Sequence, residues 1–221
     1  MSAAAEDTRP VLMILGCQKY MATLRLAMVR AARPVWHVVG VVGGAAETAV
    51  IDGILHLSVS DTYDDHPKKV YEAYKWLHAA YPTAPGILKT DDDIYYHDIA
   101  ELERLVLNNQ TVPYWGFHPE RAAAGAISIG RIQGRFDDKT PGKMRPAAAY
   151  CWGHGYWIAR SALEYLVVHC KEAFYTQHLE DICVGSCLNR IGLFPVRICP
   201  AYTEVNRAAF LEGRIVKETM L

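Results

Sequence analysis

Short apolar runs alternate with helix-like segments through the first half of the chain, and this alternation constrains the possible folds more than any other feature. The apolar runs cover residues 11–17, 35–42 and 54–59, and the segments 20–32 and 67–81 repeat apolar residues at helical spacing. Such a pattern predicts a mostly parallel sheet whose strands are joined by helices. Because ligands of these sheets bind beyond the carboxyl ends of the strands, we expect an α/β fold with its functional site at that edge.

Three consecutive aspartates, Asp91, Asp92 and Asp93, stand where another short apolar strand, beginning at Gly86, comes to an end. Carboxylates this close repel one another and raise one another's pKa values, so the cluster is unfavourable unless a cation or hydrogen-bond donors compensate it. Mn²⁺ and Mg²⁺ prefer oxygen ligands and take their remaining ligands from water and substrate phosphates. The triplet therefore predicts a divalent metal site, and a solvated acidic turn is the alternative.

The second half of the chain is less regular. Its expected elements are a helix, a strand, an aromatic strand and two more helices, at residues 98–108, 114–118, 150–159, 161–173 and from 180 onward. Residues 122–146 combine glycines with Arg and Lys, which predicts a hairpin and a mobile loop that orders over bound substrate, and a solvated surface loop is the alternative. Glu180 and Asp181 open the last helix, where the helix dipole stabilises acids, so N-terminal capping is one explanation for them.

The composition limits the class of protein. With 221 residues, of which 51% are hydrophobic and 21% charged, the chain can bury the core of one domain. A net charge of −1 with dispersed Lys and Arg disfavours nucleic acid or an anionic membrane as the main partner. No apolar stretch reaches the roughly 18 residues of a membrane helix, so we expect a soluble cytoplasmic protein or an excised domain of a larger one. The six cysteines are expected to be reduced thiols.

Four motifs follow one another in order over about residues 60–195. They are DTYDD at 61–65 with KKV at 68–70, KTDDDI at 89–94, YCWGHGY at 150–156 and EDICVG at 180–185. In this order they resemble the motifs of the β-1,3-galactosyltransferase and fringe-like glycosyltransferase family. The aspartate triplet alone would not carry that resemblance.

The resemblance implies a GT-A fold, which is a Rossmann-like nucleotide-sugar-binding sheet flanked by helices, with a smaller acceptor-side part. It implies a single domain over residues 1–221, with a nucleotide-binding half at 10–95 and an acceptor and catalytic half at 96–221. It also implies Mn²⁺ as the cofactor, with Mg²⁺ as the alternative, and an inverting transfer. The donor would be a UDP-sugar, with galactose as the best guess for the hexose. The acceptor would be a hydroxyl of a glycan or glycoprotein, and the product a β-linkage.

The resemblance also assigns roles to the acidic residues. Asp93 is the first choice as metal ligand and Asp91 the second, and the earlier acids, Asp91 and Asp92, divide contacts to the ribose or donor sugar. Inversion in one displacement needs a base that takes the proton of the acceptor hydroxyl. Asp181 matches the second acid of the family's Glu-Asp motif and is our choice for this base. Glu180 is the fallback, with hydrogen bonding to the donor or acceptor sugar as its other role.

The donor contacts rest on analogy with the fold. We expect Cys17, at the exit of the first strand, and Arg25 to cradle uracil and phosphate. Asp61 contacts uracil or ribose, or else caps the loop that follows it. Gly153 permits close approach of the backbone, and His154 hydrogen-bonds the sugar or the diphosphate or is structural.

Two aromatic residues, Trp152 and Tyr156, are expected to offer their faces to the transferred sugar, and burial in the core is the alternative for both. Some relatives supply a metal ligand from a histidine well after the Glu-Asp motif, but this chain has none beyond His178. Fewer protein ligands, or water, would then complete the metal site. Two further functions stay open. One is a non-catalytic glycan-binding module, and the other is a nucleotidyltransferase, which would need a Gly-rich loop that residues 16–20 do not form.

Overall fold

The computed structural model describes residues 7–117, 149–177 and 179–204. The loop expected at 122–146 lies outside these residues. An eight-stranded sheet has the order β3-β4-β2-β1-β5-β8-β7-β9. Its strands are β1 (Val11–Leu15), β2 (His37–Val42), β3 (Ala49–Ile51), β4 (Ile54–His56), β5 (Gly86–Asp91), β7 (Tyr114–Gly116), β8 (Gly155–Ala159) and β9 (Val196–Arg197). A separate pair joins β6 (Ile94–Tyr96) to β10 (Tyr202–Glu204).

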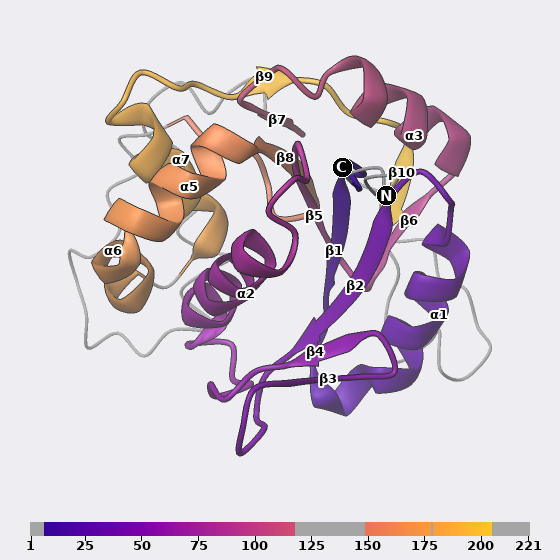
Figure 1. Ribbon diagram of the computed structural model, residues 1–221, viewed down its shortest axis with the longest axis vertical. Coiled ribbons are helices and arrows are strands. Elements are labelled where there is room, and N and C mark those ends of the chain that lie inside the picture. Colours follow the sequence, from indigo (N-terminus) through magenta and orange to yellow (C-terminus); the bar gives the residue numbers. More distant parts are fainter. Residues whose placement is uncertain (1–6, 118–148, 178, 205–221) are drawn as a thin grey trace, which may run out of the picture.

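Helices cover both faces of the large sheet (Figure 1). The chain forms η1 (Gln18–Tyr20), α1 (Met21–Ala31), α2 (His66–Ala80), α3 (Ile99–Asn108), α5 (Arg160–His169), α6 (Lys171–Thr176) and α7 (Glu180–Asn189). The α1 and α3 helices lie on one face, and α2, α5, α6 and α7 lie on the other. Because both faces are covered, β1 is buried along its whole length, which explains its uninterrupted apolar sequence.

The first half forms the parallel strands that the alternation predicts. Val11 of β1 lies opposite His37 of β2 and Ile87 of β5, and both pairings are parallel. The β3 strand was not expected. It pairs with β4 as an antiparallel hairpin whose two loop residues, Asp52 and Gly53, have φ values of 51° and 75°. Positive φ at both positions is typical of the tight hairpin turn that an Asp-Gly pair favours.

Two expected elements of the second half have other bounds, and the short strands β9 and β10 were not expected. The predicted strand at 150–159 is a strand only from Gly155, and the preceding residues turn toward the edge of the sheet. The predicted helix at 161–173 is two helices, because α5 ends and α6 begins at Cys170. The break brings Phe174 into the core against Tyr71 and Tyr74 of α2. Antiparallel pairing of β8 with β5 and β7 makes the sheet mixed.

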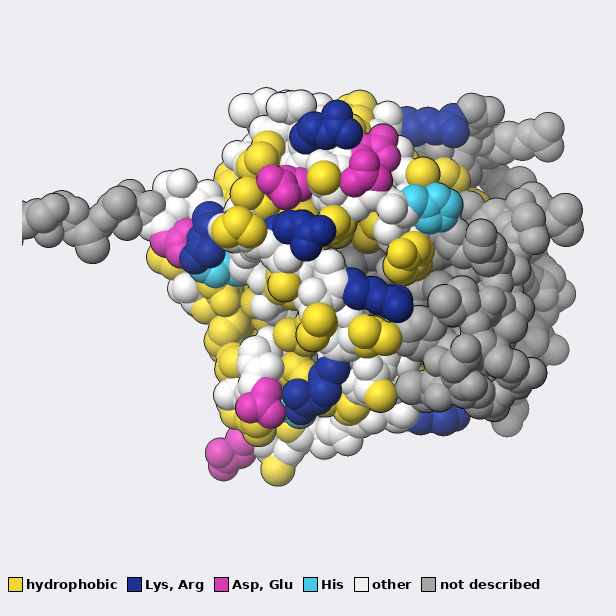
Figure 2. Space-filling model, turned by 90° about the vertical axis from the view of Figure 1, so that its right-hand side faces the viewer, with side chains coloured by type: hydrophobic (Ala, Val, Ile, Leu, Met, Phe, Trp, Pro, Cys, Tyr) yellow, Lys and Arg dark blue, Asp and Glu magenta, His cyan; other side chains and the backbone are white. Residues whose placement is uncertain are grey.

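The face that carries α1 and α3 has no stripe of one charge among its described residues. Figure 2 shows Lys and Arg side chains interspersed with acidic and apolar ones. This agrees with the net charge of −1 of the whole chain. None of the helices in the described ranges is long and apolar enough to cross a membrane.

Candidate active site

A cleft of about 420 Å³ lies at the carboxyl ends of β1 and β5. Four segments far apart in the sequence line it: the exit of β1, the loop and helix start after β4, the aspartate triplet, and the turn before β8 together with the start of α7. The predicted site residues among the lining are Cys17, Asp61, Asp91, Asp93, Gly153, His154, Glu180 and Asp181. Parallel strands place their carboxyl ends at one edge, so the βα pattern of the sequence accounts for this convergence.

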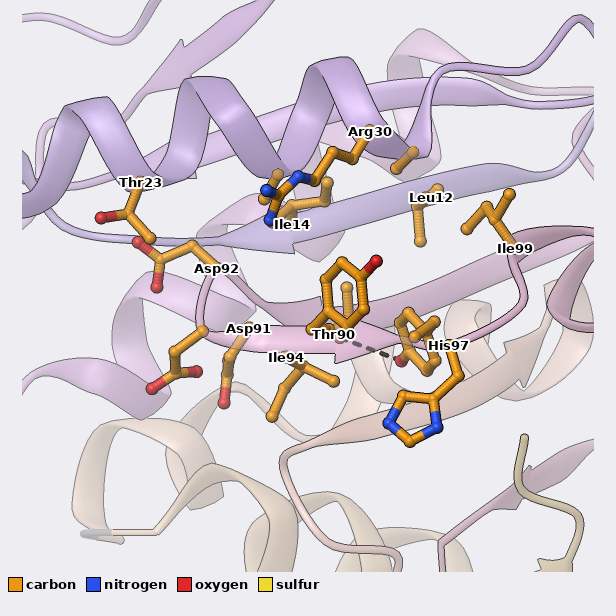
Figure 3. A pocket seen from close by; sticks show the side chains of 15 residues that line it. Leu12, Ile14, Thr23, Arg30, Thr90, Asp91, Asp92, Ile94, His97 and Ile99 are labelled. Carbon is orange, nitrogen blue, oxygen red and sulfur yellow. Dashed lines mark hydrogen bonds between the residues drawn. The ribbon is translucent and has the colours of Figure 1, made fainter. Parts of the chain in front are cut away.

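The three aspartates do not share one side of the chain. Asp91 and Asp93 line the cleft, whereas Asp92 is only 4% exposed and does not line it. Figure 3 shows Asp92 directed toward Thr23 of α1, in a neighbouring pocket of about 230 Å³ that Asp91 and Asp93 also line. A side chain added at Gly16 would place its Cβ 3.2 Å from the Asp92 carboxylate. The Asp92 carboxylate therefore lies beside α1 and outside the cleft, and its predicted contact with the donor stays a prediction.

Lys89 is fully buried between the two acidic parts of the cleft, with 0% exposure. Its Nζ lies 2.8 Å from Asp91 Oδ1 and 2.5 Å from Glu180 Oε1, and it donates to the carbonyl oxygen of Gly153 at 2.7 Å. Burial alone would lower the pKa of Lys89, but the charges of Asp91 and Glu180 hold it above its ordinary value. The ammonium group therefore stays charged at the base of the cleft.

The buried hydroxyl of Tyr156 orients the carboxylate of Glu180. The Tyr156 hydroxyl donates to Glu180 Oε2 at 2.8 Å, and it lies 2.7 Å from the hydroxyl of Tyr74. Both rings have 0% exposure, and burial raises the pKa values of both hydroxyls well above the ordinary range. The expectation that Tyr156 offers its ring to a sugar is therefore wrong, because the ring is part of the core and only its hydroxyl reaches the site residues.

Asp181 is half-buried at the first turn of α7. The N–H of Ile182 donates to its Oδ1 at 2.8 Å, and the N–H of Gly153 donates to its Oδ2 at 3.3 Å. Burial, followed by the negative charge of the neighbouring Glu180, raises the pKa of Asp181 to about 7. A carboxylate with this pKa is a stronger base than an ordinary aspartate and can accept a proton near neutral pH.

Asp61 lies at the other end of the cleft in opposite surroundings. Its Oδ1 accepts from Lys69 Nζ at 2.8 Å and from the N–H of Gly43 at 3.0 Å, and its Oδ2 accepts from the N–H of Gln18 at 2.6 Å. Lys69 also donates to the carbonyl oxygen of Gly16 at 2.8 Å. Burial raises the pKa of Asp61, but these donors outweigh it and lower the pKa below its ordinary value. Asp61 therefore ties together the exits of β1 and β2.

A family model described as Galactosyltransferase matches residues 45–198, which contain the triplet, Gly153 and the Glu180-Asp181 pair. The chain belongs to the galactosyltransferase family. Human "Beta-1,3-galactosyltransferase 4" is 28% identical over 196 residues, which cover 76% of this chain and 51% of the relative. Human "UDP-GalNAc:beta-1,3-N-acetylgalactosaminyltransferase 2" is 27% identical over 146 residues, covering 66% and 28%. The chain thus spans about half the length, or less, of the curated relatives it matches.

The fold of this galactosyltransferase-family chain also occurs in a solved structure of another protein. The 4-diphosphocytidyl-2C-methyl-D-erythritol synthase of Anaerococcus prevotii superposes with a TM-score of 0.52 at 11% identity, over 96% of this chain and 100% of that one. At this identity the likeness concerns the fold alone. The expected fold is confirmed as an α/β sheet of the GT-A-like and nucleotidyltransferase-like kind, and the family to which the chain belongs is a glycosyltransferase family.

Besides Asp92 and Tyr156, two further predicted site residues of the galactosyltransferase-family chain do not line the cleft. Arg25 lies on the exposed side of α1, where its guanidinium is 3.4 Å from Asp52 Oδ2 in the β3–β4 turn. The expectation that Arg25 cradles the donor is therefore corrected. Trp152 is half-buried and packs edge-on against Phe117 and His154, with ring centroids 4.8 and 5.6 Å apart.

The turn before β8 brings backbone and side chains close together. A Cβ at Gly153 would lie 3.0 Å from Glu180 Oε1 and 3.3 Å from Lys89 Nζ, so a side chain here would crowd these two protein groups. His154 lines the cleft, and its Nδ1 lies 3.0 Å from the hydroxyl of Tyr202 in β10. The second strand pair thereby supports one wall of the cleft.

The two buried lysines were missed as site residues. Lys89 interrupts an apolar strand, and Lys69 lies beside Val70 on the buried face of α2. A charged residue at an apolar position of a buried element is a usable signal, because it must find a partner of opposite charge. The sequence gives no indication of which partner, since Asp61 and Glu180 come from other elements.

Proposed function

We propose that this chain is a metal-dependent inverting glycosyltransferase that moves a hexose from a UDP-sugar to a hydroxyl of a glycan or glycoprotein. Galactose is the favoured sugar and a β-linkage the favoured product. The observation that carries the proposal is the pairing, in one cleft, of the carboxylates of Asp91 and Asp93 with Asp181, whose pKa is raised to about 7. The names of the relatives, which include transferases of galactose and N-acetylgalactosamine, support a hexose donor.

The donor set fits Mn²⁺, or Mg²⁺, if the nucleotide completes it. Asp91 and Asp93 face the cleft, and no cluster of three or more His, Cys, Asp or Glu side chains in the described ranges could hold a metal by itself. Such ions commonly bind to one or two carboxylates together with substrate phosphates and water. Asp93 and Asp91 would hold the ion, which when bound stabilises the negative charge that develops on the departing UDP.

Asp181 carries the proton transfer in this proposal. An inverting displacement needs a base near the acceptor hydroxyl, on the side away from the leaving group. Asp181 belongs to α7 and the metal carboxylates to the end of β5, so the two parts stand on different walls of the cleft. Glu180 is unsuited to be the base because Lys89 and Tyr156 engage both of its oxygens. Its role is to raise the basicity of Asp181 by its charge.

The remaining lining residues would hold the donor. Cys17, at the exit of β1, and His154, on the opposite wall, face the space where a nucleotide diphosphate would lie. Asp61 shapes this end through its contacts with the backbone and does not need to touch the donor itself. We retain the division into a nucleotide-binding half, residues 10–95, and an acceptor and catalytic half, residues 96–221, within one domain.

The direct test is a screen of UDP-galactose, UDP-glucose, UDP-N-acetylglucosamine and UDP-N-acetylgalactosamine for UDP release with Mn²⁺, with and without glycan acceptors. We expect metal-dependent release that an acceptor accelerates, most strongly with UDP-galactose. Binding of glycans without UDP release from any of the donors would instead support a non-catalytic glycan-binding module. Release of pyrophosphate from a nucleoside triphosphate would support a nucleotidyltransferase.

A further inference from the structure

Lys89 is the only charged side chain of the described core whose nitrogen contacts both acidic walls of the cleft. It lies on β5, opposite Met13 of β1 and Tyr156 of β8, in the middle of the sheet. An ammonium group has three protons, and the three acceptors around Nζ lie within 2.8 Å. Two hydrogen bonds, to Gly153 and Glu180, and an ion pair with Asp91 thus hold the ammonium group in place.

The three acceptors belong to three separate segments of the cleft. Asp91 ends β5, Gly153 lies in the turn before β8, and Glu180 begins α7. The peptide of Gly153 is held at its carbonyl oxygen by Lys89, and its N–H donates to Asp181 Oδ2. Lys89 therefore reaches the proposed base by two routes, through Gly153 and through the start of α7.

The charges around Lys89 are unequal. One buried ammonium faces two carboxylates, those of Asp91 and Glu180, so the cluster keeps a net negative charge. Removing the ammonium would leave two like charges near each other without a cation between them, which is unfavourable in a buried place. It would also strengthen the negative field that Asp91 presents to a cation in the cleft.

We propose that Lys89 is a positioning residue for glycosyl transfer: it fixes Asp181 through Gly153 and Glu180, and it moderates the negative charge of Asp91. This inference rests on the proposed function, in which Asp181 is the base and Asp91 a metal ligand. It leads to an unusual combination of effects. Loss of the ammonium slows turnover while the Mn²⁺–UDP complex binds more tightly.

The test compares Lys89→Met with Lys75→Met. Met removes the charge and keeps a side chain of similar length, and Lys75 is an exposed lysine on α2 whose side chain is 59% exposed. We expect Lys89→Met to lower kcat by about 10²-fold, the size of effect that a small misplacement of catalytic groups produces. Calorimetry should show Mn²⁺ binding to the UDP complex a few-fold more tightly. Lys75→Met should change neither quantity.

Two outcomes would overturn the proposal, and a third would overturn the proposed function on which it rests. Turnover of Lys89→Met equal to that of Lys75→Met would show that Lys89 positions nothing. A parallel loss of Mn²⁺ affinity and turnover would show a merely structural role. If the wild-type protein releases UDP from no donor, the proposed function fails. The Mn²⁺ titration of Lys89→Met and wild type then tests by itself whether Lys89 moderates the negative charge of Asp91.

A second variant covers the case in which Lys89→Met does not fold. Tyr156→Phe keeps the buried ring and removes the hydrogen bond to Glu180 Oε2, while the contacts of Lys89 remain. We expect kcat to fall by about 10-fold, because one neutral-to-charged hydrogen bond that holds Glu180 is lost, and Mn²⁺ affinity to stay unchanged, because Asp91 is untouched. Unchanged turnover in Tyr156→Phe would show that fixing Glu180 does not matter to the base.

Discussion

Asp61 and Asp181 stand at opposite ends of the same cleft, and burial acts on both in the same direction. Their partners differ. Asp61 accepts hydrogen bonds from the ammonium of Lys69 and from two backbone N–H groups, and its pKa falls. Asp181 has a negative neighbour, Glu180, and its pKa rises to about 7. The comparison indicates that one carboxylate is committed to holding backbone segments together, whereas the other can take up a proton during turnover.

The largest expected effect comes from Asp181→Asn, which keeps the shape of the side chain and removes its basicity. We expect turnover to fall at least about 10²-fold and UDP affinity to stay within a few-fold. Asp52→Asn is the matched control, because Asp52 lies in the β3–β4 turn, away from the cleft. Turnover is measured as UDP release. Near-normal turnover in Asp181→Asn would show that Asp181 is not the catalytic base.

Asp181→Asn should also change how the stability of the protein depends on pH. The folded-state pKa of Asp181 lies above the ordinary value of 3.8, so the wild-type protein loses stability as the pH rises toward about 7. Asn carries no charge in either state and avoids this loss. The Tm of Asp181→Asn should therefore exceed that of wild type by an amount that grows from pH 4 to pH 7 and then levels off.

The next largest effect is expected from Asp93→Ala, which tests the metal site independently of the proposed base. Asp93→Ala removes a carboxylate that faces the cleft but leaves Asp181 and its partners intact. If diphosphate and carboxylates share the ion, UDP and Mn²⁺ tighten each other's binding, typically by about 5- to 150-fold. Calorimetry should show this coupling in the wild-type protein and its loss in Asp93→Ala. If the UDP affinity of both proteins is the same with and without Mn²⁺, the metal assignment is contradicted.

The smallest expected effect on chemistry comes from Asp61→Asn. This change weakens charge-assisted hydrogen bonds, so the free energy of unfolding at pH 7 should fall by about 1–3 kcal/mol while kcat changes little. Because the folded-state pKa of Asp61 is lowered, its stabilising contribution is present above about 3.8 and is lost as the pH falls. The difference between variant and wild type in urea unfolding should therefore shrink below pH 4. A difference that persists there would assign the loss to packing.

The periodicity of the sequence predicted the parallel strands β1, β2, β4 and β5 and the edge at which the cleft lies. The chemistry of the aspartate triplet suggested a site at that edge, and the resemblance to known glycosyltransferases added Glu180 and Asp181 to it. The β3 hairpin was missed although Asp52-Gly53 is a strong turn signal, because the preceding strand has only three residues. The local hydrophobic pattern was thus sufficient to predict most of the parallel strands of the sheet.

The direction of single side chains could not be predicted in the same way. Asp92 is packed against α1 while its two neighbours face the cleft, and Tyr156 is buried under Glu180 instead of lining a sugar site. These outcomes depend on which helix covers each face of the sheet, and that is decided by contacts between distant segments. The roles of Lys89 and Lys69 likewise depend on ion-pair partners that lie on other elements.

The most direct test of the contrast between the two carboxylates is an NMR titration of their carboxyl carbons in the ¹³C-Asp-labelled protein. Asp181→Asn and Asp61→Asn serve to assign the two signals. We expect the signal of Asp181 to titrate near pH 7 and that of Asp61 below 3.8. If Asp181 instead titrates at or below 3.8, its surroundings do not prepare it to accept a proton, and the proposed division of roles between the two ends of the cleft is contradicted.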